Sequence, residues 1–148
     1  MSVRLLRGTL SFLLCLTLFA GCSRSPKGPE TVEVTGTVTF DGTPIEGANV
    51  IFHPVENGDQ SLSSQSITDK EGRFELSTFV GGSKFKPGIA PGRYAVAVTK
   101  LDTASVSTTL APPKNLLPRK YANPKTSGQT ADVALGRENN FEFALNRN

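Results

Sequence analysis

The chain has 148 residues, of which 16 are basic, 13 are acidic and 37% are hydrophobic. This length suits one ordinary domain, and a formal net charge of +3 gives no electrostatic basis for nucleic-acid binding. Fourteen glycines and ten prolines indicate many turns, which favours an all-β fold.

The first 21 residues have the organisation of an export signal. Arg4 and Arg7 precede an apolar stretch of 12 residues, Thr9 to Ala20, whereas a membrane-spanning helix needs about 20. Leucine and phenylalanine would cover every face of a helix here, so the stretch lacks the apolar stripe of a buried amphipathic helix. A charged start, a short apolar centre and a small-residue exit are typical of a signal peptide. We therefore predict that residues 1–21 are removed on export.

The residues at the predicted cleavage point resemble the lipobox of bacterial lipoproteins. Phe19-Ala20-Gly21-Cys22 follows the usual Leu-(Ala/Ser)-(Gly/Ala)-Cys form except at Phe19. The resemblance implies cleavage between Gly21 and Cys22, a diacylglyceryl group on the Cys22 sulfur, and a second acylation of the new amino group. Two or more acyl chains anchor a protein stably, so we expect a lipid-anchored protein that does not span the bilayer. An ordinary secreted protein is the alternative.

The mature chain would keep 127 residues and would be nearly neutral. Cys15 leaves with the signal and Cys22 is acylated, so no disulfide or thiol site is expected. Arg4 and Arg7 also leave, which reduces the charge to 14 basic against 13 acidic residues, or +1. Residues 22–31 are mostly small and polar and include two prolines, and they read as a flexible tether to a domain at 32–148. The residue after the cysteine is Ser23 rather than the aspartate that retains some lipoproteins in the inner membrane, which favours the outer membrane.

The rest of the chain shows the two-residue alternation of half-buried strands. In residues 32–40, valine and phenylalanine alternate with glutamate and threonine. Seven short strands are predicted, at 32–40, 48–54, 63–68, 73–77, 89–100, 130–135 and 139–146. Their predicted inward side chains include Val34, Val38, Ala48, Val50, Phe52, Phe74, Leu76, Tyr94, Val96, Val98, Ala131, Val133, Leu135, Phe141, Phe143 and Leu145. This pattern, with no predicted helix, is typical of a β-sandwich.

Three turn motifs resemble the carboxypeptidase regulatory-like domain. They are Asp41-Gly42-Thr43-Pro44-Ile45, Thr68-Asp69-x-x-Gly72-x-Phe74 and Pro91-Gly92-x-Tyr94-x-Val96. The resemblance covers roughly residues 32–100 and implies a seven-stranded, transthyretin-like (prealbumin-like) sandwich. In carboxypeptidases this domain is an accessory beside the catalytic one.

The motif residues also have mechanical roles that the sequence predicts. Gly72 can take the positive φ that closes a short hairpin loop, and Asp69 can accept hydrogen bonds from that loop's amides. Pro91-Gly92 can turn the chain into Tyr94, whose ring would fill the core while its hydroxyl stays wet. The same turn chemistry explains Asp41 better than a calcium site, because no ladder of alternating aspartates is present.

The sequence predicts neither a catalytic centre nor a cofactor. His53 is the only histidine and has no cysteine partner, so it makes a poor metal ligand set. Related folds carry hydroxyisourate hydrolases, which use several histidines, and intradiol dioxygenases, which hold iron with two tyrosines and two histidines. This chain offers Tyr94, Tyr121 and a single histidine. We therefore predict a protein that is not an enzyme and binds no metal.

The long connection 101–129 is the strongest candidate for a binding segment. Long loops without regular structure are often functional. Three cations, Arg119, Lys120 and Lys125, surround Tyr121. An exposed aromatic among cations could bind a glycan, an anionic polymer or a protein. In the alternative, which we favour, Leu116, Leu117 and Tyr121 fold back and cap an open end of the sandwich.

These observations predict a lipid-anchored protein of the cell envelope, acting as a non-catalytic binding or structural module. Its partner would be an envelope protein or glycan met through loops at one end of the sandwich. One alternative is a small-ligand carrier of transthyretin type, which would require oligomers. Another is a hydrolase with a site that its sequence does not reveal.

Overall fold

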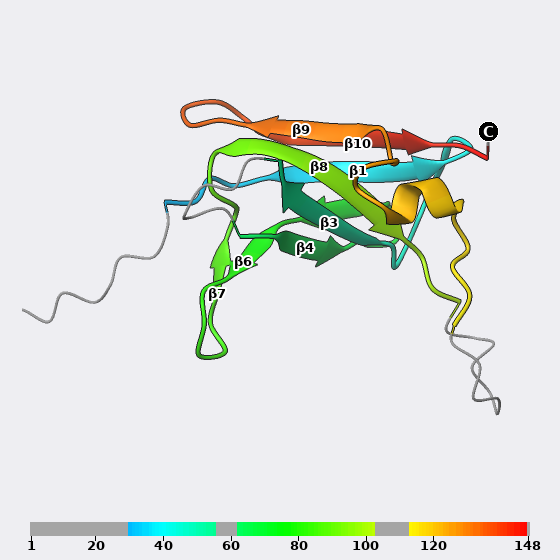
Figure 1. The fold of residues 1–148 in the computed structure, drawn as a ribbon, viewed down its shortest axis with the longest axis horizontal. Helices are drawn as coiled ribbons and strands as arrows, with labels where there is room; N and C mark the ends of the chain where they lie inside the picture. The colour runs from blue at the N-terminus through cyan, green and yellow to red at the C-terminus, as the bar shows by residue number, and fades with distance from the viewer. Residues whose placement is uncertain (1–29, 56–61, 103–112, 148) are drawn as a thin grey trace, which may run out of the picture.

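The structure is a computed structural model that describes residues 30–55, 62–102 and 113–147, which form two packed β-sheets (Figure 1). The predicted signal peptide, Gly21, Cys22 and the tether up to residue 29 lie outside the described residues. Within the described ranges, no helix is long and apolar enough to span a bilayer.

The smaller sheet has four strands and the larger has six. The smaller follows the order β10-β1-β2, with β5 also paired to β1, and β1 and β10 run parallel. Its strands are β1 (Thr35–Phe40), β2 (Thr43–Pro44), β5 (Arg73–Glu75) and β10 (Asn140–Leu145). The larger sheet is antiparallel and follows the order β7-β6-β4-β3-β8-β9. Its strands are β3 (Asn49–Pro54), β4 (Ser64–Ile67), β6 (Ser77–Phe79), β7 (Phe85–Pro87), β8 (Gly92–Thr99) and β9 (Gln129–Val133).

The predicted all-β sandwich is confirmed, and each of the seven predicted strands overlaps an observed one. Three further short strands are present: β2 and β7 fall in segments that were expected to be loops, and β6 begins at the last residue of the predicted strand 73–77. Two or three residues are too few to show an alternation in sequence, so such strands are defined only by the neighbours with which they pair.

Alternation in the strands builds the core between the sheets. Phe52 of β3 is fully buried and lies about 6 Å, centroid to centroid, from four other aromatic rings. These rings are Phe74, Tyr94, Phe141 and Phe143. Three of them belong to the smaller sheet, so Phe52 joins the two layers at their centre.

Leu135 was predicted to face the core, and that prediction is wrong. β9 ends at Val133, and the chain then crosses from the larger sheet to β10 in the smaller one. The crossing turn is held by Asn139, whose side chain accepts from the Ala134 N–H and donates to the Ala134 carbonyl, each at 3.0 Å. Because Leu135 belongs to this turn and not to the strand, 56% of it is exposed.

Tyr94 fills the core as predicted, but its hydroxyl does not rely on water. The ring is 1% exposed, and the hydroxyl donates to the Ala90 carbonyl at 2.8 Å. This bond ties the start of β8 to the turn before it. Burial raises the pKa of Tyr94 above its usual value because ionisation would place a charge in the core.

Tyr94→Phe should lower stability and change its dependence on alkaline pH. Losing the hydrogen bond should cost about 0.5–1.5 kcal/mol at neutral pH. Because the pKa of Tyr94 is raised in the folded state, its contribution to stability is fully present below about pH 10, the pKa of tyrosine in the unfolded chain. The contribution is lost as pH rises through the folded pKa. Urea unfolding of both proteins at several pH values should show the wild type losing more stability than Tyr94→Phe above about pH 10. Equal losses in both would contradict this role for Tyr94.

Candidate functional site

Tyr121 lies in the 3₁₀ helix η1 (Arg119–Ala122) and is 3% exposed. Its hydroxyl accepts from the Asn146 N–H at 3.0 Å and can donate to the Asn146 carbonyl at 3.2 Å. η1 packs against β8 of the larger sheet, while Asn146 directly follows β10 of the smaller one. The ring therefore closes one end of the sandwich between its two layers. Tyr121 is not an exposed binding aromatic, and its proposed role in partner contact is corrected to a structural one.

Leu117 shares this structural role, whereas Leu116 does not. Leu117 is 5% exposed and belongs to the core, but 51% of Leu116 is exposed. Asn115 shapes the turn here, because its side-chain oxygen accepts from the Lys100 N–H at 2.9 Å and from the Leu117 N–H at 3.2 Å. The capping prediction is thus confirmed for two of its three residues. Residues 113–125 are called the cap below.

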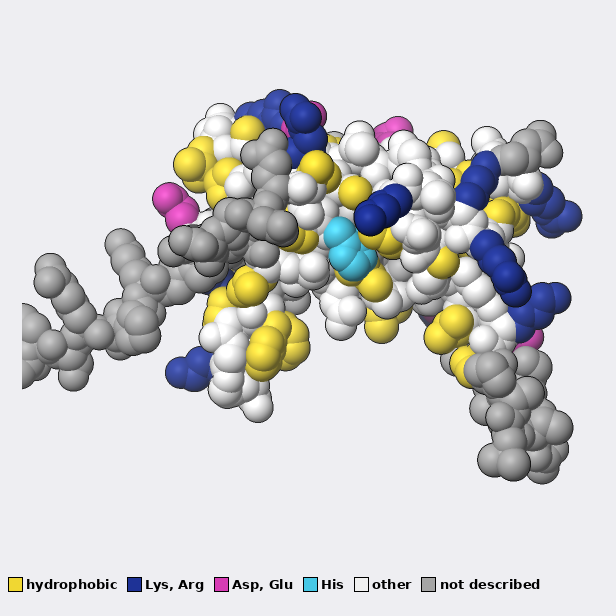
Figure 2. Space-filling model, viewed as in Figure 1, with side chains coloured by type: hydrophobic (Ala, Val, Ile, Leu, Met, Phe, Trp, Pro, Cys, Tyr) yellow, Lys and Arg dark blue, Asp and Glu magenta, His cyan; other side chains and the backbone are white. Residues whose placement is uncertain are grey.

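The surface of the cap is basic. Residues 113–125 contain no acidic residue and four basic ones, Lys114, Arg119, Lys120 and Lys125. Lys120 Nζ lies 4.9 Å from the centroid of the Tyr121 ring, over its face. Arg119 and Lys125 are exposed, and neither forms an ion pair with any described residue. Figure 2 shows lysine and arginine side chains gathered at this end of the molecule. The fold therefore brings the predicted cations together around the cap, but it does not expose the Tyr121 ring among them.

Two basic residues near the cap are already engaged. Arg147 forms an ion pair with Asp41 at 3.0 Å and lies over the Phe40 ring. Lys100 Nζ donates to the Glu46 carbonyl at 2.5 Å. These contacts fix the surrounding loops, so Arg119 and Lys125, together with the exposed Lys114, are the cap cations placed to meet a partner.

The other candidate residues do not form a reactive cluster. His53 lies on the outer face of β3, opposite Ala95 of β8, in the middle of the face that Figure 2 shows. Asp69 accepts from the amides of Glu71 and Arg73 at 3.0 and 2.7 Å, and Gly72 has a φ of 74°, as the turn prediction requires. Within the described ranges, no three His, Cys, Asp or Glu side chains gather in a way that could hold a metal ion.

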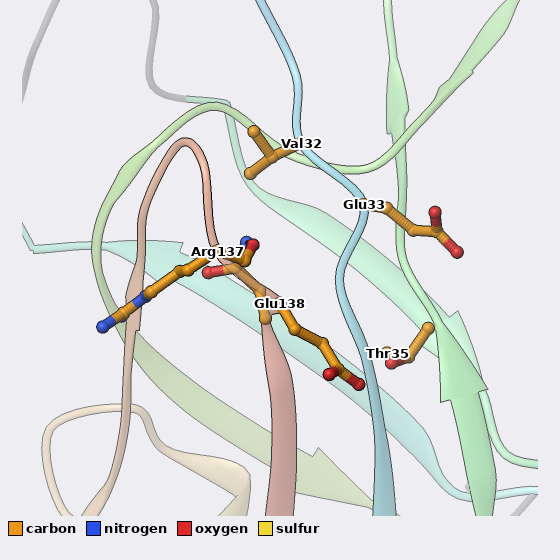
Figure 3. A pocket seen from close by; sticks show the side chains of 6 residues that line it. Val32, Glu33, Thr35, Arg137 and Glu138 are labelled. Atoms are coloured by element: carbon orange, nitrogen blue, oxygen red, sulfur yellow. The ribbon is translucent and has the colours of Figure 1, made fainter.

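Two shallow clefts border the smaller sheet. The first, of about 360 Å³, is lined by Val32, Glu33, Thr35, Arg137, Glu138 and Asn139. Figure 3 shows that its charged side chains do not converge, since Arg137 extends away from Glu33 and Glu138. Arg137 instead donates to the Asp132 carbonyl. The second, of about 490 Å³, lies beside β1 and β5 and includes Asp69 and Arg73, which pair with each other at 3.8 Å.

Comparison with known proteins gives a domain match but no activity. Residues 34–99 match DUF6795, a domain of unknown function. This region runs from just before β1 to the end of β8, so it leaves out the cap, β9 and β10. No curated protein matches the chain. A solved structure that matches part of the chain is the dioxygenase domain of a dioxygenase carbohydrate-binding protein fusion from Streptomyces sp. SirexAA-E, with 23% identity and a TM-score of 0.37 over 82% of this chain and 84% of that one. At that TM-score the similarity carries no conclusion about function.

Proposed function

We propose that this protein is a lipid-anchored module of the bacterial cell envelope that binds an anionic envelope polymer or protein through its cap, without catalysis. The observation that carries the binding role is the basic cap itself, with Arg119 and Lys125 exposed and without ion pairs among the described residues. The anchoring role rests on the lipobox-like Phe19-Ala20-Gly21-Cys22.

The arrangement of the fold supports membrane attachment at one end of the sandwich and partner binding at the other. The chain enters at Val32, and β1 leads from this entry end toward the opposite end, where η1 and the C-terminus lie (Figure 1). A tether attached at the entry end would hold that end near the bilayer. The cap would then point away from the membrane, toward partners in the envelope.

The turn residues support a carboxypeptidase regulatory-like, transthyretin-like domain as the scaffold. Asp69 and Gly72 form the hairpin turn that this resemblance implies, and Tyr94 fills the core after the Pro91-Gly92 turn. Such a domain is an accessory in carboxypeptidases, which agrees with a binding role by analogy only. We place the anchor in the outer membrane on the identity of Ser23.

Site-specific photo-crosslinking in intact cells tests the binding role. A photo-reactive residue at position 125 should capture one specific envelope component, whereas the same residue at the exposed position 135, in the turn after β9, should not. Arg119→Glu combined with Lys125→Glu should abolish the capture, and higher ionic strength should weaken it, because exposed charges are screened by salt. Capture that is equal at both positions, or unaffected by the charge reversals, would remove the support for the cap as the binding surface.

A further inference from the structure

Strands β6 and β7 form a hairpin that projects from the body of the sandwich, on the side where the chain enters (Figure 1). Its tip is closed by hydrogen bonds between Val80 and Lys84, at 3.0 Å, and between Lys84 and Gly81, also at 3.0 Å. Gly81, Gly82 and Ser83 all have positive φ values. Residues 77–87 are called the Phe hairpin below.

The outward face of the Phe hairpin carries large apolar side chains that are exposed and are not packed into the core. Phe79 and Phe85 are paired across the two strands, and their ring centroids are 5.5 Å apart. Phe79 is 52% exposed, Phe85 66% and the neighbouring Val80 38%. Figure 2 shows hydrophobic side chains gathered on the projecting arm. Large apolar groups gathered on an exposed projection mark an interaction surface more often than isolated ones do.

The opposite face of the hairpin is fixed to the core. Thr78 is 2% exposed, and its hydroxyl donates to the Gly88 carbonyl at 2.7 Å and bonds the Ser64 hydroxyl at 2.7 Å. Gly88 in turn donates to the Leu76 carbonyl at 2.8 Å. The base of the hairpin is therefore held rigidly, and the two phenylalanines are presented outward.

The charge of the Phe hairpin is positive. It contains Lys84 and Lys86, and no acidic residue occurs anywhere from Leu76 to Leu101. Lys84 is exposed and directly precedes Phe85 in the sequence. Lys86 pairs with Thr78 across the hairpin and so lies on the face opposite the two phenylalanines, which leaves Lys84 as the cation at the exposed tip. An aromatic pair beside a cation matches the interface of a bilayer, where the rings enter the headgroup region and the cation meets anionic phosphates.

The hairpin also lies next to the start of the tether. Val32 and Ile89 exchange backbone hydrogen bonds of 2.9 and 3.0 Å, which fixes the entering chain beside the segment that follows β7. Val32 lies ten positions after Cys22 in the chain. Even fully extended, that length spans at most about 35 Å, so an acylated Cys22 would keep the Phe hairpin close to the membrane.

We propose that the Phe hairpin docks on the anionic phospholipid surface of the membrane and inserts Phe79 and Phe85 into its interface. This inference rests on the proposed lipid anchor and extends it, since the hairpin would fix the orientation of a domain that the anchor alone only holds nearby. It would direct the cap outward from the bilayer.

A second copy of the chain is a poorer occupant for this surface. β7 is one of the two edge strands of the six-stranded sheet, but it has only three residues, and its last is Pro87, which cannot donate a backbone hydrogen bond. A short, proline-ended edge resists pairing with another strand. A protein partner is distinguished from lipid by the experiment below.

Tryptophan fluorescence provides the test, because the chain contains no tryptophan of its own. Phe85→Trp places the single fluorophore on the Phe hairpin, and Leu116→Trp places it on an exposed site of the cap as the matched control. Each full-length protein is isolated in its acylated form and reconstituted in phosphatidylethanolamine–phosphatidylglycerol vesicles, with and without brominated acyl chains. We expect blue-shifted emission and strong quenching by brominated lipid for Phe85→Trp, and neither effect for Leu116→Trp. Adding Phe79→Ser and Lys84→Glu to Phe85→Trp should abolish most of the quenching.

The outcomes separate this inference from the anchor. Unquenched Phe85→Trp in protein that co-sediments with the vesicles would overturn the hairpin inference and leave the anchor intact. Equal quenching at both tryptophans would overturn it as well, because the domain would then have no preferred orientation. A mature protein without the acyl mass would refute the anchor. In that case the unacylated Phe85→Trp protein is mixed with the same vesicles, and quenching by brominated lipid supports the hairpin inference while its absence overturns it. A blue shift that appears only on adding an envelope protein without lipid would also count against the bilayer as the occupant.

Discussion

Replacing Cys22 by serine is expected to remove the protein almost completely from the membrane fraction. The serine hydroxyl cannot take the place of the thiol in diacylglyceryl transfer, so the acyl chains would be lost. Each buried CH₂ of such chains contributes about 0.8 kcal/mol, and two chains together make attachment effectively stable. Fractionation of cells, with the mass of the mature protein, measures this effect: wild type should carry the acyl increment and Cys22→Ser should not.

Cys15→Ser is the matched control for this experiment. It makes the same chemical change seven residues upstream, inside the predicted signal, and should leave both the mature mass and the membrane attachment unchanged. A Cys22→Ser protein that stays in the membrane fraction as firmly as wild type would show that Cys22 is not the anchor. Weak residual binding is instead expected from the Phe hairpin, and salt should lower it only in part, because salt screens the charge of Lys84 but not the burial of Phe79 and Phe85.

The alternation of apolar residues was enough to predict the layers of this fold. Val50 and Phe52 in β3, and Val96 and Val98 in β8, are fully buried as their spacing requires. Each lies in a strand long enough for a two-residue period to show. Leu135 followed the same period but lies beyond the end of its strand, because the chain changes sheets there. A sequence period cannot show where a strand stops pairing.

The Phe hairpin could not be predicted for a related reason. Its strands have three residues each, and the glycines between them read as an ordinary loop. The strands exist because Ser77 pairs with Gln65 of β4 and Phe79 pairs with Phe85, contacts that depend on the finished sheet. The sequence did hint at a hairpin, since Phe79 and Phe85 flank a turn-forming segment. It could not show that both rings are exposed, because this depends on the neighbouring Thr78 facing the core.

The candidate site shows the same limit in another form. The composition of the segment around Tyr121 allowed two opposite arrangements, an exposed aromatic among cations or a buried lid. The buried arrangement is fixed by Asn146, which lies 25 residues from Tyr121 in sequence. Its backbone is within hydrogen-bond distance of the Tyr121 hydroxyl. The cations were predicted correctly as neighbours, because they are close in the chain, while the burial of the ring depended on distant contacts.

Phe52→Ala is expected to be among the most damaging substitutions in the sandwich. Phe52 has no exposed surface and contacts aromatic rings from both sheets, so its removal leaves a cavity where the layers meet. Such changes cost about 3–5 kcal/mol. A domain of ordinary size is stable by only about 5–15 kcal/mol, so the variant should unfold at a much lower urea concentration or fail to accumulate.

Phe79→Ala makes the same chemical change on the Phe hairpin and separates burial from side-chain identity. Phe79 is half exposed and its nearest ring partner is Phe85, so the loss in the free energy of unfolding should stay below about 1 kcal/mol. Urea unfolding of both variants in the unacylated Cys22→Ser background measures the difference directly. Similar losses for the two would mean that the Phe hairpin is part of the folding core, and its phenylalanines would then need no ligand to explain them. A large loss for Phe52→Ala alone would leave Phe79 as a side chain that the sandwich does not need for stability, which is what an insertion surface requires.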